Sequence, residues 1–132
     1  MTDKMVIDHV GIATDDLDDL SELYTELFGA EIAHTETFDG MNVEFLAVGD
    51  AYFELLEPLE STGAIASYLD GNGPGLHHVA VATDDIEAAL AGAAEMGVDL
   101  IDEEPREGAW GHDVAFLHPK STGGILFEFV EH

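Results

Sequence analysis

The sequence predicts an α+β fold made of two βαβββ modules, and an internal repeat is the main reason. Residues 7–16 (IDHVGIATDD) return as residues 76–85 (LHHVAVATDD), and the segments FELLE at 53–57 and FEFVE at 127–131 also match. Apolar residues alternate within these segments, as they do in strands. After residues 7–16 and after residues 76–85 they recur instead at helical spacing. A duplication of this kind determines the whole fold. No linker is long enough to separate the copies, so we expect one pseudo-symmetric domain over residues 1–132, with module one at about 5–58, a connector at 59–75 and module two at about 76–131.

The first module begins with a predicted strand over residues 5–13. Thr14-Asp15-Asp16 then provides helix-capping side chains and acidic first-turn residues. Gly29 is expected to end the helix, because glycine tolerates the left-handed conformation found there. The helix is predicted from apolar residues at helical spacing: Leu17, Leu20, Leu23, Tyr24, Leu27 and Phe28. Three strands follow, with turns at Asp39-Gly40 and Gly49-Asp50: 31–38, 41–48 and 51–57.

The connector is expected to contain a short helix and then a loop. Ser61 or Thr62 could cap a helix that runs through Ile65, Tyr68 and Leu69. Residues 70–75 (DGNGPG) are predicted to be loop throughout, because glycine and proline dominate them.

The second module repeats the order of the first. A strand over 76–83 leads to a helix from Asp85 to Met96, and Gly97 ends it. Three further strands complete the module: 98–103, 113–118 and 124–130.

Alternation along the last strand of each module places its central glutamate. Ile125, Phe127 and Phe129 share one face, which should pack on the helices, so Glu128 points to the opposite, concave face. By the same rule Glu54 lies opposite Phe53 and Leu55.

The first strand of each module carries a histidine beside small residues. His9 shares its face with Gly11 and Ala13, and His78 shares its face with Ala80 and Ala82. These small side chains should leave open space over the two imidazoles. His77 aligns with Asp8 in the repeat and points away, so His78 is the predicted ligand.

The sequence therefore predicts one metal site held by His9, Glu54, His78 and Glu128. Two imidazole nitrogens and two carboxylate oxygens suit a borderline divalent ion better than Mg²⁺ or Ca²⁺. Co²⁺ is the expected ion, with Mn²⁺, Ni²⁺ and Zn²⁺ as alternatives. A strand histidine or glutamate taken singly is more often an ordinary core or surface side chain. Matched positions in both copies favour the metal site.

Other polar residues allow both a functional and a structural interpretation. Glu44 is expected on the cavity wall as a general base, or else is an edge-strand charge. His112 and His118 are interpreted as loop histidines, and His34 and His132 carry no signal. Gly123-Gly124 forms a tight turn whose N–H groups could also hold a carboxylate or phosphate.

Charge is the extreme feature of the composition. The chain has 29 Asp and Glu against 3 Lys and Arg, a formal net charge of -26, with 46% hydrophobic residues and no cysteine. The chain lacks the clustered Lys and Arg that nucleic-acid binding needs. It has no cysteine for a thiolate metal site, and no apolar run typical of a membrane span or targeting segment. The acid is spread along the chain, so we expect a cytoplasmic protein of a halophile rather than an acidic face for a basic partner. Salt near 1 M shortens the Debye length to ~3 Å.

At these residues the chain resembles the vicinal oxygen chelate superfamily, whose paired βαβββ modules form a curled mixed-sheet half-barrel around one metal, with helices on the convex face. Within it the chain resembles the methylmalonyl-CoA epimerase family. Besides residues 7–13, the stretches that carry the resemblance are ELLEPL at 54–59, GLHHV at 75–79, DEEPREGA at 102–109 and FLHPKSTGG at 116–124.

The resemblance implies a metal-dependent epimerisation of (2R)- and (2S)-methylmalonyl-CoA by 1,1-proton transfer. The family's metal positions fall on His9, His78 and Glu128, with Glu54 where relatives carry Glu or Gln. A metal-stabilised enolate forms between two carboxylates, for which Glu44 and Glu128 are the candidates. Family members are commonly homodimers.

Two other functions stay open at this point. A glyoxalase I-type lactoylglutathione lyase offers the same ligand set, and a metal-free binding module shares the fold but should lack a ligand. An extradiol dioxygenase is disfavoured by the fourth ligand.

Overall fold

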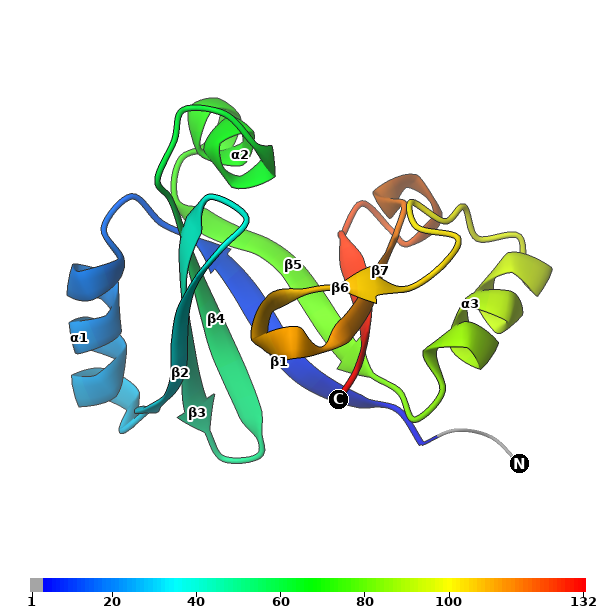
Figure 1. The fold of residues 1–132 in the computed structure, drawn as a ribbon, viewed down its shortest axis with the longest axis horizontal. Helices are drawn as coiled ribbons and strands as arrows, with labels where there is room; N and C mark the ends of the chain where they lie inside the picture. Colours follow the sequence, from blue (N-terminus) through cyan, green and yellow to red (C-terminus); the bar gives the residue numbers. More distant parts are fainter. Residues whose placement is uncertain (1–3) are drawn as a thin grey trace. The chain divides into compact units, whose positions relative to one another are not determined.

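The computed structural model describes residues 4–132, and these fall into two compact units. We call residues 9–77 the first unit, and residues 78–132 together with 4–8 the second unit. Each unit contains a four-stranded mixed sheet with a helix against it (Figure 1). None of the helices in residues 4–132 is both long enough and apolar enough to cross a bilayer.

The first unit has the strand order β2-β3-β4-β1. β1 runs parallel to β4, whereas β2, β3 and β4 form an antiparallel meander. The elements are β1 (Val6–Ala13), α1 (Leu17–Phe28), β2 (Glu31–Phe38), β3 (Met41–Val48) and β4 (Ala51–Pro58). The Asp16 side chain caps α1 by accepting from the N–H of Asp19 at 3.1 Å, and Gly29 ends it at φ 68°. The predicted strands and helix of this module are therefore confirmed.

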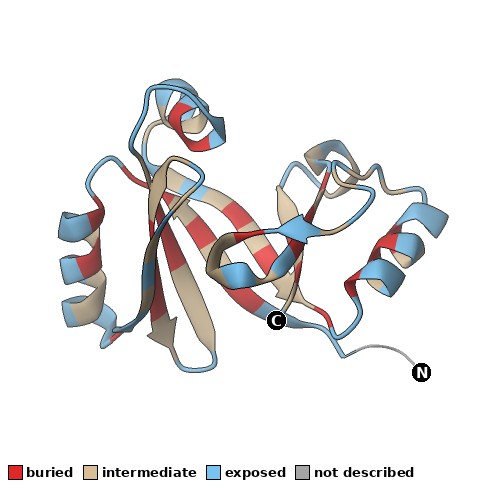
Figure 2. Cartoon of the chain, in the orientation of Figure 1, coloured by how far each residue is buried: buried red, intermediate tan, exposed pale blue. Residues whose placement is uncertain are grey.

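The core of the first unit lies between α1 and its sheet. Leu17, Ala30, Leu46 and Leu55 are buried together, with Phe53 packed against them. Figure 2 shows α1 with its exposed side turned outward and the buried residues of β3 and β4 beside it. The expected packing of Phe53 and Leu55 on the helix is confirmed.

The connector differs from its prediction. α2 (Ala64–Asn72) begins at Gly63 without a side-chain cap, so neither Ser61 nor Thr62 has the predicted role. The helix also continues through residues 70–72, which were expected to be loop. Its last turn is closed by hydrogen bonds from Gly73 N to Leu69 O at 2.8 Å and from Asn72 Nδ2 to Tyr68 O at 3.1 Å. These local bonds outweigh the low helix propensity of Gly71.

The second unit has the strand order β5-β8-β7-β6. β5 runs parallel to β8, and β7 is antiparallel to both β8 and β6. Its elements are β5 (Gly75–Ala82), α3 (Ile86–Glu95), β6 (Arg106–Glu107), η1 (Ala109–Gly111), β7 (Asp113–Leu117), η2 (Pro119–Ser121) and β8 (Phe127–Glu131). Phe127 and Phe129 pack toward the buried α3 residues Ile86, Leu90 and Ala93, as the alternation predicts.

Two predicted strands of the second module are wrong in extent. Residues 98–103 form only an isolated bridge between Leu100 and Leu117. The Asp102 carboxylate accepts from the N–H of Phe116 at 2.9 Å, so a side chain replaces part of the expected ladder. The last strand begins at Phe127 rather than at residue 124, because the positive φ angles of Gly123 and Gly124 continue the preceding turn.

The two modules share the same helix-capping arrangement. Thr14 and Thr83 each accept from the N–H two residues later, at 3.1 and 3.2 Å. Asp16 and Asp85 cap α1 and α3 through contacts of the same length, 3.1 Å. The predicted duplication of two βαβββ modules and the α+β fold class are therefore confirmed.

Candidate metal centre

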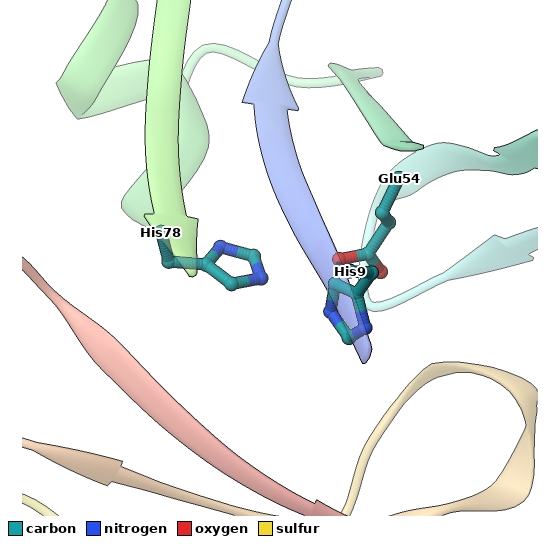
Figure 3. A group of neighbouring side chains, drawn as sticks. All are labelled: His9, Glu54 and His78. Atoms are coloured by element: carbon teal, nitrogen blue, oxygen red, sulfur yellow. Dashed lines mark ion pairs between the residues drawn. The ribbon is translucent and has the colours of Figure 1, made fainter. Parts of the chain in front are cut away.

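The first unit holds a buried histidine and glutamate side by side. Nε2 of His9 on β1 lies 3.3 Å from Oε1 of Glu54 on β4, and both side chains are at most 7% exposed. Register explains the contact: β1 and β4 are parallel with Gly11 opposite Glu54, so His9 projects from the same face two residues earlier. Figure 3 shows the Glu54 carboxylate and the His9 ring side by side.

The second unit repeats this pair. Nε2 of His78 on β5 lies 3.3 Å from Oε1 of Glu128 on β8, again with both side chains almost fully buried. Ala80 stands opposite Glu128 as Gly11 stands opposite Glu54. The two modules therefore build the same histidine–carboxylate pair from the same strands in the same register.

A phenylalanine lies edge-on to each histidine, which the sequence reasoning missed. Phe45 meets His9 at a centroid distance of 5.6 Å, and Phe116 meets His78 at 5.7 Å. Each phenylalanine is also the cross-strand partner of the glutamate in its pair. The signal was present in the sequence as a second repeat, VEFL at 43–46 and VAFL at 114–117. These rings restrict the imidazole orientation and exclude water from one side.

A buried carboxylate beside an imidazole has a limited set of chemical uses. Burying either group is costly unless it forms a hydrogen bond, pairs with an opposite charge or coordinates a metal. Each pair offers one nitrogen and one oxygen donor, so both pairs together supply the mixed N/O set that divalent transition ions prefer. In the second unit Ala80 packs with Val114 and Val130 in a buried apolar cluster.

Glu44 does not share a sheet face with the histidine–glutamate pair of its unit. It stands opposite Leu55 on β4, whereas Phe45 stands opposite Glu54. Leu55 and Leu46 belong to the core under α1, so Glu44 projects to the helix side. The expectation that Glu44 lies on the cavity wall is therefore wrong. Glu44 and Leu46 lie on the same face of β3, and Leu55 stands opposite Glu44 on β4. Pairing these strands in this register from the sequence could have revealed the correct face of Glu44.

The remaining histidines have local surroundings of their own. His77 packs edge-on against Tyr68, with ring centroids 5.3 Å apart. His34 pairs with Glu36 at 3.3 Å, and His118 Nδ1 accepts from the N–H of Lys120. His132, which carried no signal in the sequence, lies 2.6 Å from Asp8, and its ring packs at a tilt against that of His112 with centroids 4.0 Å apart.

The glycine turn before β8 fits the structural interpretation. Gly123 and Gly124 have φ values of 77° and 87°, which favour glycine. The Gly124 N–H donates to Pro119 O at 2.8 Å, so this group is already used within the turn.

With this geometry established, comparison with known proteins shows the family. Residues 8–116 match the model of the glyoxalase/bleomycin resistance protein/dioxygenase superfamily. The ethylmalonyl-CoA/methylmalonyl-CoA epimerase of Cereibacter sphaeroides is 36% identical over 129 residues, covering 95% of this chain and 96% of that protein.

Solved structures agree with this assignment. A hypothetical protein from Bacillus halodurans matches with a TM-score of 0.94 at 37% identity, over 98% of this chain and 95% of that one. Methylmalonyl-CoA epimerase from Mycobacterium tuberculosis matches with a TM-score of 0.89 at 38% identity, over 95% of this chain and 86% of that one.

Proposed function

The chain belongs to the glyoxalase/bleomycin resistance protein/dioxygenase superfamily, and its relatives confirm the predicted enzyme class, that of an epimerase. We propose that it interconverts (2R)- and (2S)-methylmalonyl-CoA by moving a proton at the carbon between the thioester and the carboxylate. The observation that carries the proposal is the buried histidine–glutamate pair that each module repeats, His9–Glu54 and His78–Glu128. It occurs in a chain that matches named epimerases over nearly its whole length.

The proposal includes one divalent ion held by both pairs. His9, Glu54 and His78 are buried and each offers one ligand atom. Glu128 is the fourth ligand in the proposal, because it is the repeat partner of Glu54 and contacts His78. The bound ion would act as a Lewis acid for two oxygens of the substrate. Co²⁺, Mn²⁺, Ni²⁺ and Zn²⁺ all suit two imidazoles with two carboxylates.

The chain's own carboxylates would move the proton. Epimerisation requires one group to remove the proton from one face of the carbon and a second group to return it to the other face. Glu128 is the first candidate, because it is buried in the proposed site. Since Glu44 projects to the α1 side, the second candidate becomes Glu54, the repeat partner of Glu128. A duplicated module supplies two such carboxylates in equivalent environments.

Phe45 and Phe116 would support this chemistry without taking part in it. Each ring lies against one histidine and opposite one glutamate of the proposed site. Lowering the local water content strengthens every electrostatic interaction between the site and a developing negative charge. The rings also keep each imidazole nitrogen directed toward its carboxylate partner.

The deciding experiment compares two substrates on the same preparation. The metal-loaded chain is assayed with each epimer of methylmalonyl-CoA, using a mutase that accepts one epimer as the coupling enzyme. A parallel assay offers the glutathione hemithioacetal of methylglyoxal. We expect turnover of both epimers and none of the hemithioacetal. Turnover of the hemithioacetal alone would assign the glyoxalase I activity, and inactivity toward both, with metal bound, would reject the epimerase.

We also propose that the enzyme works in a salt-rich cytoplasm and that it forms a homodimer. The net charge of -26 supports the first of these, because such a chain needs concentrated salt to screen its own repulsion. Sedimentation in concentrated KCl tests the second, and a monomer mass at micromolar concentration would reject it.

A further inference from the structure

Glu44 is a buried carboxylate on the helix side of the first unit's sheet. Its side chain is only 7% exposed, and its Oε1 accepts no hydrogen bond from the described residues. A buried acceptor without a partner is unfavourable, and more so when it carries charge. The epimerase site gives no reason for it, because Glu44 projects from the opposite face of β3. The carboxylate therefore needs another explanation.

Other oxygen donors share this face next to Glu44. Asn42 lies two residues earlier on β3 and stands opposite Glu57 on β4. Its Nδ2 donates to Glu57 Oε1 at 3.0 Å, and its Oδ1 lies 3.4 Å from the hydroxyl of Thr37. Glu57 Oε2 accepts from the N–H of Leu17. Each carboxylate oxygen can accept more than one contact, so the Glu57 oxygens keep coordinating capacity.

The second module shows that packing alone does not require a carboxylate at this position. In the VEFL and VAFL repeat, Glu44 corresponds to Ala115, which is fully buried in the core under α3. The flanking elements correspond as well: Glu131 accepts from the N–H of Ile86 as Glu57 accepts from that of Leu17. An alanine therefore suffices in the same fold, and the charge at Glu44 is an addition specific to the first module.

We infer that Glu44, Glu57, Asn42 and Thr37 form a second cation site, separate from the histidine–glutamate pairs. All of its donors are oxygens, which suits a hard cation such as Ca²⁺, Mg²⁺, Na⁺ or K⁺ and disfavours the transition ions that imidazole attracts. Thr37 lies on edge strand β2 and is exposed, so one of the proposed ligands is open to solvent. The cation supplies the partner that the Glu44 oxygen lacks.

The test measures cation binding rather than activity. The Co²⁺-saturated chain is titrated by calorimetry with CaCl₂, MgCl₂, NaCl or KCl, with choline chloride holding the ionic strength constant. Three proteins are compared: the unaltered chain, Glu44→Gln and Glu31→Gln. Glu31 is an exposed residue of β2, so its substitution removes the same charge without touching the site. We expect one hard cation to bind the unaltered chain and Glu31→Gln alike, and Glu44→Gln to bind at least about tenfold more weakly, because affinity follows the number of charged ligands.

Thermal unfolding gives a second, independent readout. In choline chloride Glu44→Gln should be at least as stable as the unaltered chain, because it replaces a buried carboxylate whose Oε1 has no hydrogen-bond partner by a neutral amide. The bound cation should raise the melting temperature of the unaltered chain but not that of Glu44→Gln. On the unaltered chain alone, the ¹³C resonance of the Glu44 carboxyl should shift saturably with the same cation. Equal responses of all three proteins, or no difference between the cations and choline, would overturn the inference.

Discussion

The carboxylate of Glu57 accepts a hydrogen bond of 2.9 Å from the backbone N–H of Leu17, the first residue of α1. Glu131 makes the same contact, at 2.8 Å, with Ile86 at the start of α3. Each glutamate follows the proposed metal ligand of its strand by three residues and projects from the opposite face. The end of the ligand-bearing strand is thereby fixed to the helix that follows the histidine-bearing strand.

These caps should contribute measurably to stability. A carboxylate at a helix N-terminus satisfies an otherwise free N–H and interacts favourably with the helix dipole. Glu131→Ala should therefore lower the free energy of unfolding by about 1–2 kcal/mol. Urea unfolding in concentrated KCl measures this loss. Glu95→Ala, near the C-terminal end of α3, is the control: its negative charge lies at the unfavourable end of the dipole, so its removal should not destabilise the chain. Equal losses in both variants would contradict the role of the cap.

The first module could be predicted from sequence almost residue by residue. Its signals are local. Asp16 caps α1, Gly29 ends it, and turn residues such as Asp39-Gly40 separate strands in which apolar residues alternate regularly. The histidine–glutamate pairs could be predicted for a related reason. Strand parity and the repeat together determine which face each side chain occupies, and the structure pairs His9 with Glu54 and His78 with Glu128 accordingly.

Two of the errors arose where contacts between residues distant in sequence decide the structure. Residues 98–103 have the composition of a strand, but Asp102 binds the backbone of Phe116 and removes part of the ladder. Glu44 was assigned to the wrong face because its neighbours Val43 and Phe45 look like core residues. Both faces of β3 are buried here, so burial alone could not distinguish the α1 side from the ligand side.

Metal content should depend on the repeated pairs and not on the adjacent histidine. His78→Ala and Glu128→Ala each remove one donor of the proposed site and should lose most of the bound divalent ion. His77→Ala should retain it, because His77 packs on Tyr68 instead. Inductively coupled plasma mass spectrometry on protein dialysed against chelator-free buffer gives the stoichiometry. Full metal occupancy in both ligand variants would rule out the site.

Stability should depend strongly on salt. With 29 acidic side chains against 3 basic ones, the folded chain repels itself when screening is weak. Two of the cations, Arg106 and Lys120, are already paired with aspartates at 3.2 Å. We expect the melting temperature to fall steeply below roughly 0.5 M KCl, where the Debye length exceeds ~4 Å. A melting temperature that stays constant from low to multimolar KCl would instead favour an acidic surface that binds a basic partner.

Catalysis should distinguish Glu54 and Glu128, the glutamates of the histidine–glutamate pairs, from Glu44 on the α1 side of the first unit's sheet. Glu128→Gln keeps an oxygen donor but removes the proton carrier, so turnover should fall about 10²–10⁴-fold. Glu54→Gln should lose turnover to a similar extent if it serves the other face of the carbon. Glu44→Gln should keep turnover, because its side chain lies on the α1 side.

Proton exchange in heavy water separates the roles of Glu54 and Glu128. If each serves one face, Glu128→Gln should still exchange the alpha proton of one epimer, whereas Glu54→Gln should exchange only that of the other. The defect should appear in kcat more than in KM, because the proton-transfer step is affected and not substrate binding. Loss of exchange from both epimers in either variant would show that the two carboxylates act together through the metal site. A large loss of turnover in Glu44→Gln, with metal content intact, would return Glu44 to the mechanism as its second acid–base group.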